Sequence, residues 1–259
     1  MKEARYFYVP QAAEKNELPT EEATHALRVL RLKPGDELFL MDGNGTFYEA
    51  HVTQADKHCY YEIDHALPQA KTWTSHIHLG IAPTKMMDRI EWLAEKATEI
   101  GFDELSFLNC KFSERKTLRA DRIEKIVVSA AKQSRKPFLP QVHELTPFTQ
   151  FIDSHTSGHR FIAHCYDEIE RADLFDELNA LIANTATAPT DATAPDAATG
   201  ADTQPSITIL VGPEGDFSID EVKQAMAQGY KPVSLGKSRL RTETAGLYAV
   251  MLAQLATRL

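Results

Sequence analysis

The chain has 259 residues, of which 43% are hydrophobic and 25% charged, and its formal net charge at pH 7 is −9. This composition is typical of a folded globular protein with room for two domains, and it excludes an intrinsically disordered chain. The first residues lack the apolar segment of a secretion signal, and the longest nearly uncharged apolar run, residues 245–256, is too short to cross a bilayer. The sequence therefore predicts a cytoplasmic protein without a membrane span.

Positive charge is concentrated in two stretches despite the acidic total. Residues 111–142 contain nine Lys or Arg and three acids, a local charge of +6. A second basic stretch runs through Lys231, Lys237, Arg239 and Arg241, with no acid between them. Because salt screens exposed charges beyond about 8 Å, a ligand responds to such patches rather than to the net charge. Both stretches are therefore predicted contacts for an anionic polymer.

Short strands and tight turns dominate the first 70 or so residues. We expect four strands, at residues 5–9, 37–42, 46–52 and 59–64. Their alternating side chains and the Pro-Gly and Gly-Asn-Gly turns between them are typical of a small β-barrel. One helix is expected at residues 21–31, and it carries His25, Arg28 and Arg31.

Strands and helices alternate in the rest of the chain. The expected strands are residues 77–82, 104–108, 161–166, 207–212 and 232–236, and the expected helices are residues 88–100, 118–134, 218–229 and 242–256. This alternation predicts an α/β layer with a largely parallel sheet. Ser218 and Glu221 have the spacing of a capping box at the start of one helix. The last helix is apolar almost all round, which predicts burial in the core or against another subunit.

These patterns predict two domains, residues 1–72 and 73–259. Residues 184–206 interrupt the second domain with a segment rich in Ala, Thr and Pro that has no large apolar side chain. Such a segment cannot bury enough surface to offset its ordering entropy, so we expect a flexible insert between two strands.

Two strand-to-helix connections carry the densest polar chemistry of the second domain. An apolar strand runs into the Gly-Pro-Glu-Gly of residues 212–215, and another passes through Gly236 and a basic loop to a helix start at Thr242. Ligands of open α/β sheets bind beyond the carboxyl ends of the strands, where glycines allow close approach to the backbone. A plain turn or a helix cap is the alternative, but capping does not account for Arg241 beside Glu243. We therefore predict that both loops close on one ligand.

A basic stripe marks the helix expected at residues 118–134. Five side chains at steps of three and four share its face: Arg122, Lys125, Ser129, Lys132 and Lys136. A solvated helix face explains this stripe as well as phosphate contact does. No group of His, Asp and Glu has metal-ligand spacing, no serine lies in GxSxG, and the three cysteines form no CxxC. The sequence thus predicts neither a metal site nor a hydrolase.

Taken together, the motifs resemble those of one known family. VGPEGDF, followed by LGKSRLRTETA, is similar to the two signature loops of the SPOUT-class methyltransferases that modify N3 of a uridine in 16S ribosomal RNA of the small subunit, the RsmE family. HALRVLRLKPGDELFLMDGNG, KMMDRIEWLAEKATEIG and AAKQSRKPFLPQV are similar to further segments of that family. The resemblance extends from about Tyr6 to Ala256.

The resemblance implies an N-terminal PUA-like β-barrel that binds RNA and a C-terminal α/β domain with a deep trefoil knot. It also implies S-adenosylmethionine as the cofactor and a homodimer that completes the site. The cofactor residues that it implies come from three loops: His164, Cys165, Val211, Gly212, Pro213, Glu214, Gly215, Leu235, Gly236, Leu240, Arg241, Thr242 and Thr244. Asp216 departs from the family pattern, which usually has a second glycine there, and Ser238 with Arg239 replaces an Arg-Ile pair.

Methyl transfer to N3 of uracil requires the loss of a ring proton. Our hypothesis is that Arg241 polarises a uracil carbonyl and that the proton passes to water or to a carboxylate such as Glu243. Contacts with RNA are expected from seven residues: His25, Arg28, Arg31, Arg122, Lys132, Arg135 and Lys136. Two alternatives stay open, a SPOUT methyltransferase acting on another RNA and a non-catalytic RNA-binding or ribosome-assembly protein.

Overall fold

The computed structural model describes residues 5–186 and 205–258. Most of the insert predicted at residues 184–206 lies outside these residues. Within them, no helix has the length and apolar character needed to cross a membrane. The chain forms two compact units, one with the residues up to Lys71 and Val127–Leu139, the other with Thr72–Ile126 and the residues from Pro140 onward.

The N-terminal unit contains a mixed four-stranded sheet in the order β1-β2-β3-β4. Its elements are β1 (Tyr6–Tyr8), η1 (Ala12–Glu14), α1 (Thr20–Thr24), η2 (His25–Val29), β2 (Glu37–Met41), β3 (Thr46–Ala55) and β4 (Cys59–Pro68). β1 runs parallel to β2, and the other neighbours are antiparallel. The four predicted strands are all present. The predicted helix is also present, as α1 continued by the π-helix η2.

The apolar residues of these strands form the core of the N-terminal unit. Phe7, Leu38, Leu40 and Val52 are almost completely buried and cluster with Ala26 of the helix. Alternate residues of a strand point to the same face, so the period-2 pattern of the sequence places them together.

The second half of helix α3 (Ala120–Ser134) belongs to this unit as well. Its Ala131 packs against Met41 and Phe47 of the sheet. Beyond the helix, Phe138 lies so close to Gly45 that a Cβ atom on the glycine would approach the ring to 2.6 Å. Gly45 also has φ +108, so both the backbone conformation and the close contact require glycine here.

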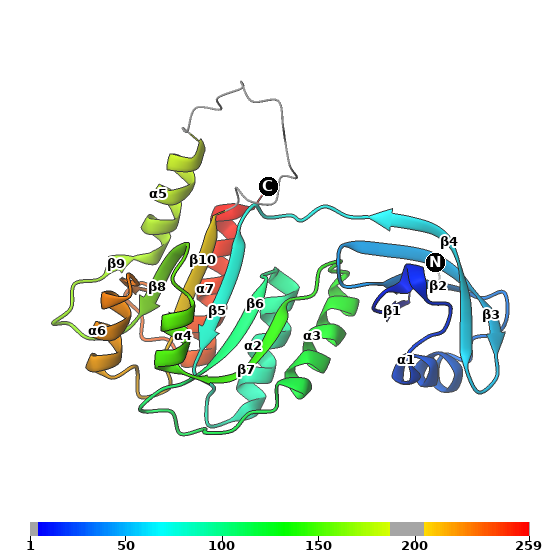
Figure 1. Ribbon diagram of the computed structural model, residues 1–259, viewed down its shortest axis with the longest axis horizontal. Helices are drawn as coiled ribbons and strands as arrows, with labels where there is room; N and C mark the ends of the chain where they lie inside the picture. Colours follow the sequence, from blue (N-terminus) through cyan, green and yellow to red (C-terminus); the bar gives the residue numbers. More distant parts are fainter. Residues whose placement is uncertain (1–4, 187–204, 259) are drawn as a thin grey trace. The chain divides into compact units, whose positions relative to one another are not determined.

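The C-terminal unit is built on a seven-stranded parallel sheet in the order β7-β6-β5-β10-β8-β11-β9 (Figure 1). Its further elements are β5 (His76–Ile81), α2 (Met87–Ile100), β6 (Glu104–Asn109), β7 (Gln141–Pro147), α4 (Phe148–Ser154), β8 (His159–Ala163), β9 (Ala172–Asp173), α5 (Leu174–Ala186), β10 (Ser206–Val211), α6 (Ile219–Ala227), β11 (Lys231–Ser234) and α7 (Thr242–Thr257).

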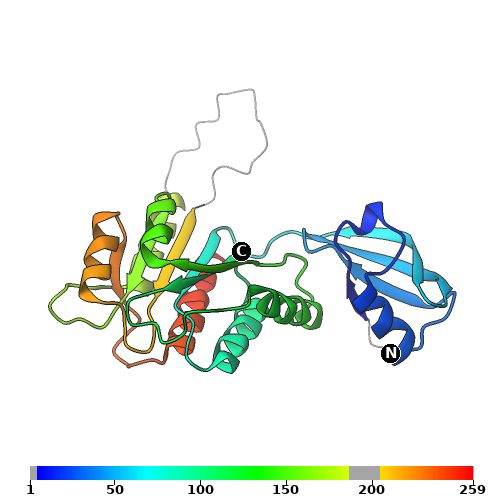
Figure 2. The ribbon, with the colours of Figure 1, turned by 60° about the horizontal axis from the view of Figure 1, so that its bottom comes forward.

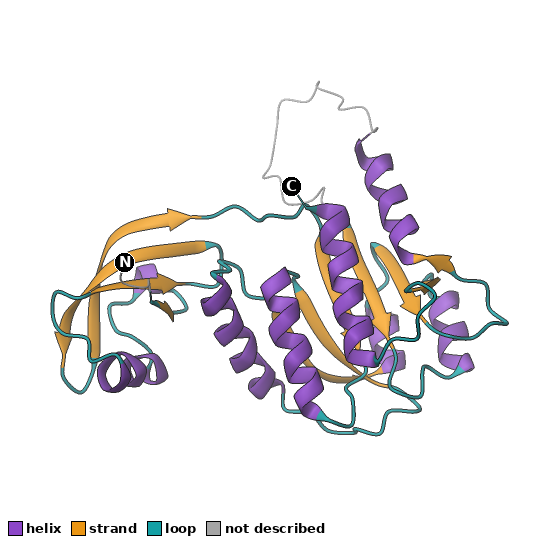
Figure 3. Ribbon diagram, turned by 180° about the vertical axis from the view of Figure 1, so that it is seen from behind, coloured by secondary structure: helices purple, strands orange, loops and turns teal. Residues whose placement is uncertain are grey.

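Helices cover both faces of this sheet. α2 and α7 pack on one face, while α4 and α6 lie on the other (Figures 1 and 3). Figure 2 shows the same layers from a second direction. The predicted α/β layer with a parallel sheet is therefore confirmed. β7, α4, β9 and α5 were not predicted from the sequence. β7 is a polar edge strand, and α4 and β9 are too short for a clear periodic pattern.

Candidate functional site

Three neighbouring strands end side by side and form the candidate site. β8 pairs in parallel with both β10 and β11, so the loops that follow Ala163, Val211 and Ser234 leave the sheet at the same edge. These loops line a cavity of about 530 Å³. Small-molecule sites in proteins measure roughly 300–1,000 Å³. Gly212 and Gly236 both line this cavity, as expected if the two loops close on one ligand.

Most of the residues predicted to bind a cofactor meet at this cavity. Eleven of the thirteen line it: His164, Cys165, Val211, Gly212, Pro213, Glu214, Leu235, Gly236, Leu240, Arg241 and Thr242. Gly215 and Thr244 are not among the lining residues. Thr244 is instead exposed on the first turn of α7.

Two arginines of the lining were missed by the sequence analysis. Arg89 comes from the first turn of α2, and Arg171 from the segment after β8. Arg89 could have been predicted, because α2 follows β5. The carboxyl end of β5 lies at the same edge of the parallel sheet as the carboxyl end of β10. Nothing in the local pattern around Arg171 singles it out.

Hydrogen bonds to Asp216 link the loop after β8 to the loop after β10. Its Oδ2 accepts a hydrogen bond from the backbone N–H of Cys165 at 2.8 Å, and its Oδ1 accepts one from the N–H of Phe217 at 2.7 Å. The residue has φ +68, in the left-handed region where glycine is usual and Asp is tolerated better than most side chains. Asp can therefore adopt the backbone conformation of the glycine in the family pattern. Its carboxylate adds two hydrogen bonds that a glycine side chain cannot make.

His164 presents a buried polar group to the cavity wall. Its side chain is 4% exposed, and its Nδ1 accepts a hydrogen bond from the N–H of Tyr166 at 3.2 Å. The proton therefore resides on Nε2, which has no hydrogen-bond partner among the described residues. Burial lowers the pKa of His164, so the ring is neutral at neutral pH. A buried donor without a partner is a group that a ligand can satisfy.

The two residues predicted to be catalytic differ in their access to the cavity. Arg241 is exposed and lines it. Glu243 is only 6% exposed and is not among the lining residues. Its Oε1 lies 3.8 Å from Nε of Arg89, and its Oε2 is buried with no hydrogen-bond partner in the described part of the chain. The carboxylate of Glu243 is thus in contact with the lining through Arg89.

Six of the seven residues predicted to contact RNA belong to the N-terminal unit: His25, Arg28, Arg31, Lys132, Arg135 and Lys136. His25, Arg28, Arg31 and Arg135 are exposed. Lys132 differs from them, because its Nζ lies 2.6 Å from Oε1 of Glu22 in a mostly buried ion pair. This ion pair links the second half of α3 to α1.

The other two predicted RNA contacts are also engaged within the protein. Lys136 is partly buried, and this burial lowers its pKa. Arg122 belongs to the C-terminal unit, where its Nε lies 2.7 Å from Oε1 of Glu91 in an ion pair that is not aligned as a hydrogen bond.

Comparisons with known proteins bear on both units. The family described as "RNA methyltransferase domain" matches residues 71–254, and the family described as "RNA methyltransferase PUA domain" matches residues 18–59. The Bacillus subtilis protein named ribosomal RNA small subunit methyltransferase E is 26% identical, over 98% of this chain and 97% of that protein.

Solved structures agree over nearly the whole chain. A crystal structure described as a probable rRNA-methyltransferase from Porphyromonas gingivalis is 39% identical, with a TM-score of 0.81 and 98% of both chains covered. The ribosomal RNA small subunit methyltransferase E of Neisseria gonorrhoeae, solved bound to S-adenosyl methionine, is 25% identical, with a TM-score of 0.76 and the same coverage. Because the first family match alone spans well over half of the sequence, this chain belongs to the RNA methyltransferase family.

Proposed function

We propose that this protein transfers a methyl group from S-adenosylmethionine to N3 of a uridine in 16S ribosomal RNA of the small subunit. The observation that carries the proposal is the single cavity at the carboxyl ends of β8, β10 and β11, which both glycine loops line. The names of its relatives support ribosomal RNA of the small subunit as the substrate. A substrate of this kind places the reaction in the cytoplasm.

The proposal includes an architecture of two domains, a PUA-like barrel in residues 1–72 and a SPOUT domain with a deep trefoil knot in residues 73–259. The mixed sheet of the N-terminal unit and the family match at residues 18–59 support the barrel. Two observations support the knot. The family match covers residues 71–254, and α7, which follows the last strand of the chain, packs against α2, α5 and β5.

The proposal also includes a homodimer. Three apolar side chains of α7 are exposed at helical spacing, namely Tyr248 (38%), Met251 (39%) and Leu255 (46%). Residues at steps of three and four lie on one face of a helix. An apolar stripe of this kind is a suitable surface for a second subunit.

The residues around the cavity fit S-adenosylmethionine. When bound, this cofactor supplies an electrophilic methyl group on a positively charged sulfur. Its charges of both signs find partners in the lining, which contains the carboxylates of Glu214 and Asp216 as well as the guanidinium groups of Arg89 and Arg171. The unpartnered Nε2–H of His164 offers a hydrogen bond to an acceptor on the cofactor.

Arg241 is the residue that we assign to the substrate. It is exposed at the mouth of the cavity, immediately before α7, and its guanidinium can donate to a uracil carbonyl oxygen. Loss of the N3 proton leaves negative charge on the carbonyl oxygens, so a donor placed there stabilises the ring that attacks the methyl group. Positioning of the ring in line with the methyl group contributes the rest of the acceleration.

The proton of N3 passes to Glu243 in our proposal. The unpartnered Oε2 of this residue has capacity to accept a hydrogen bond. Its carboxylate does not line the cavity, so transfer has to proceed past Arg89, through water or a small movement of that side chain.

The activity is tested by incubating the full chain with tritiated S-adenosylmethionine and small ribosomal subunits that lack the modification. Label is expected at N3 of one uridine of 16S RNA. Label in a different RNA would indicate a SPOUT methyltransferase of other specificity. RNA binding without cofactor binding or label would instead identify a non-catalytic RNA-binding protein.

Arg241→Ala is expected to lower kcat about 100-fold or more, the effect of removing one donor to a developing oxyanion. Cofactor affinity should change little, as measured by calorimetry. Lys237→Ala is the matched control, because this cation of the same loop is exposed and is not among the lining residues. Undiminished methylation by the Arg241 variant would remove the assigned role.

Glu243→Gln is expected to lower kcat about 100-fold, because the amide cannot accept the proton. Arg89→Ala provides the comparison. If Glu243→Gln loses no more activity than Arg89→Ala, Glu243 acts by holding Arg89 and is not the base.

The salt dependence of RNA binding tests the N-terminal contacts. Each lost phosphate contact lowers the slope of log K against log salt by about 0.7–0.9. The double substitution of Arg28 and Arg31 by Ala is therefore expected to lower it by about 1.5. Lys132→Ala should leave the slope unchanged, because its ammonium group is paired with Glu22. An unaltered slope in the double variant would refute phosphate contact by these two arginines.

A further inference from the structure

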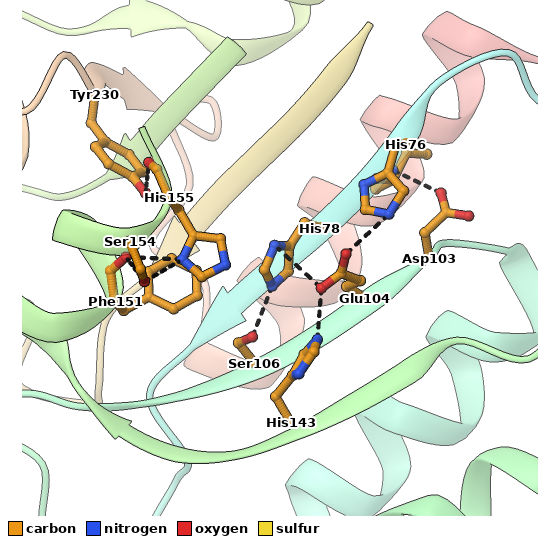
Figure 4. A network of polar contacts seen from close by, with 11 residues as sticks. His76, His78, Asp103, Glu104, Ser106, His143, Phe151, Ser154, His155 and Tyr230 are labelled. Atoms are coloured by element: carbon orange, nitrogen blue, oxygen red, sulfur yellow. Dashed lines mark hydrogen bonds and ion pairs between the residues drawn. The ribbon is translucent and has the colours of Figure 1, made fainter. Parts of the chain in front are cut away.

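Four imidazole and carboxylate side chains gather on one face of the parallel sheet, away from the loops of the cavity (Figure 4). In the register of the sheet, His78 of β5 stands opposite Glu104 of β6, and Glu104 stands opposite Gln141 of β7. Side chains two positions apart on a strand point to the same face. His76 therefore joins His78 on that face, and His143 joins them from β7.

The carboxylate of Glu104 is the centre of this cluster. Its Oε2 lies 2.6 Å from Nε2 of His143 and 3.9 Å from Nδ1 of His78, while its Oε1 lies 3.1 Å from Nε2 of His76. One ligand atom each from His78, Glu104 and His143 can be chosen so that all three lie within 4.8 Å of one another. Ligand atoms this close together could hold a single metal ion.

A hydrogen bond to Ser106 orients His78, the most deeply buried member of the cluster. Nε2 of His78 lies 2.8 Å from the hydroxyl oxygen of Ser106, which is also buried. A proton on Nε2, donated to Ser106, leaves the lone pair of Nδ1 directed toward Glu104. Ligating histidines are held in this way, with the second ring nitrogen donating to a neighbouring oxygen.

Aromatic rings close the cluster on the side of α4. The ring of His155 stacks on Phe151 with a centroid separation of 3.9 Å, and both rings lie edge-on to His78, at 5.1 and 5.4 Å. Apolar surroundings of this kind limit the access of water and strengthen electrostatic interactions.

We propose that His78, Glu104 and His143 bind one divalent transition-metal ion, with zinc as the preferred one. Two imidazole nitrogens and one carboxylate oxygen form a ligand set that suits zinc, with the fourth position left to solvent. Binding replaces the hydrogen bond between Nε2 of His143 and Oε2 of Glu104 with bonds from both atoms to the ion. Because each ligand comes from a different strand, the ion links β5, β6 and β7. Ser106 is a positioning residue.

The proposal is tested on the full chain, freed of any affinity tag and stripped of metal with a chelator. Zinc is titrated in competition with a chromophoric chelator, and Co²⁺ is used as a spectroscopic probe. We expect one equivalent of zinc per chain and the visible absorption bands of four-coordinate Co²⁺. His143→Ala is expected to weaken zinc binding at least about 100-fold, and Ser106→Ala about 10-fold.

The matched control is His58→Ala. His58 and Glu17 form a single exposed pair with the same 2.6 Å nitrogen–oxygen separation but no further imidazole, so this variant should keep full affinity. His143 lies on the edge strand with 33% of its side chain exposed, so its replacement should leave the fold intact, which circular dichroism checks. Glu104→Gln supplies an independent second variant and should also weaken zinc binding at least about 100-fold.

Three results would overturn the proposal. The first is less than one equivalent of bound zinc in the wild-type chain. The second is equal zinc affinity in the wild type and in the folded His143 and Glu104 variants, which would leave the cluster as a hydrogen-bond network only. The third is an intense thiolate-to-Co²⁺ charge-transfer band that is lost in Cys165→Ser, since Cys165 is an exposed free thiol that can bind the metal instead.

Discussion

The site depends on the bridge that Asp216 makes between two loops. Parallel strands bring the carboxyl ends of β8 and β10 to one edge of the sheet, but strand pairing alone does not set the distance between the loops beyond them. Asp216 sets it, because its carboxylate accepts one hydrogen bond from the backbone of Cys165 and another from that of Phe217. A charged acceptor bonded to backbone N–H groups forms strong hydrogen bonds, which offset the cost of a left-handed backbone at this residue.

The charge of the cavity differs from the charge of the chain. The protein has a formal net charge of −9, yet the lining contains four arginines and two acids. A concave surface lined mainly by one sign of charge concentrates ligands of the opposite sign. A chain of negative net charge can therefore present a local positive surface to an anionic ligand at this cavity.

The C-terminal unit uses its sheet in two ways. The carboxyl ends of β8, β10 and β11 supply the loops of the cavity, whereas the face of β5, β6 and β7 supplies the histidine cluster around Glu104. Similarly, the cationic side chains of α3 have more than one role. Lys132 is a mostly buried link between α3 and α1, while Arg135 is exposed, with its guanidinium 5.7 Å from the ring of Tyr6.

The sequence by itself determined the alternation of strands and helices, the two glycine loops and the capping box at Ser218, because these features arise from residues close together in the chain. The resemblance of its motifs to a known family also indicated most of the residues that line the cavity. Only the tertiary structure decided that Lys132 pairs with Glu22, that Arg89 reaches the cavity and that His143 meets Glu104. Those contacts join distant segments through strand order and register, which local periodicity does not encode.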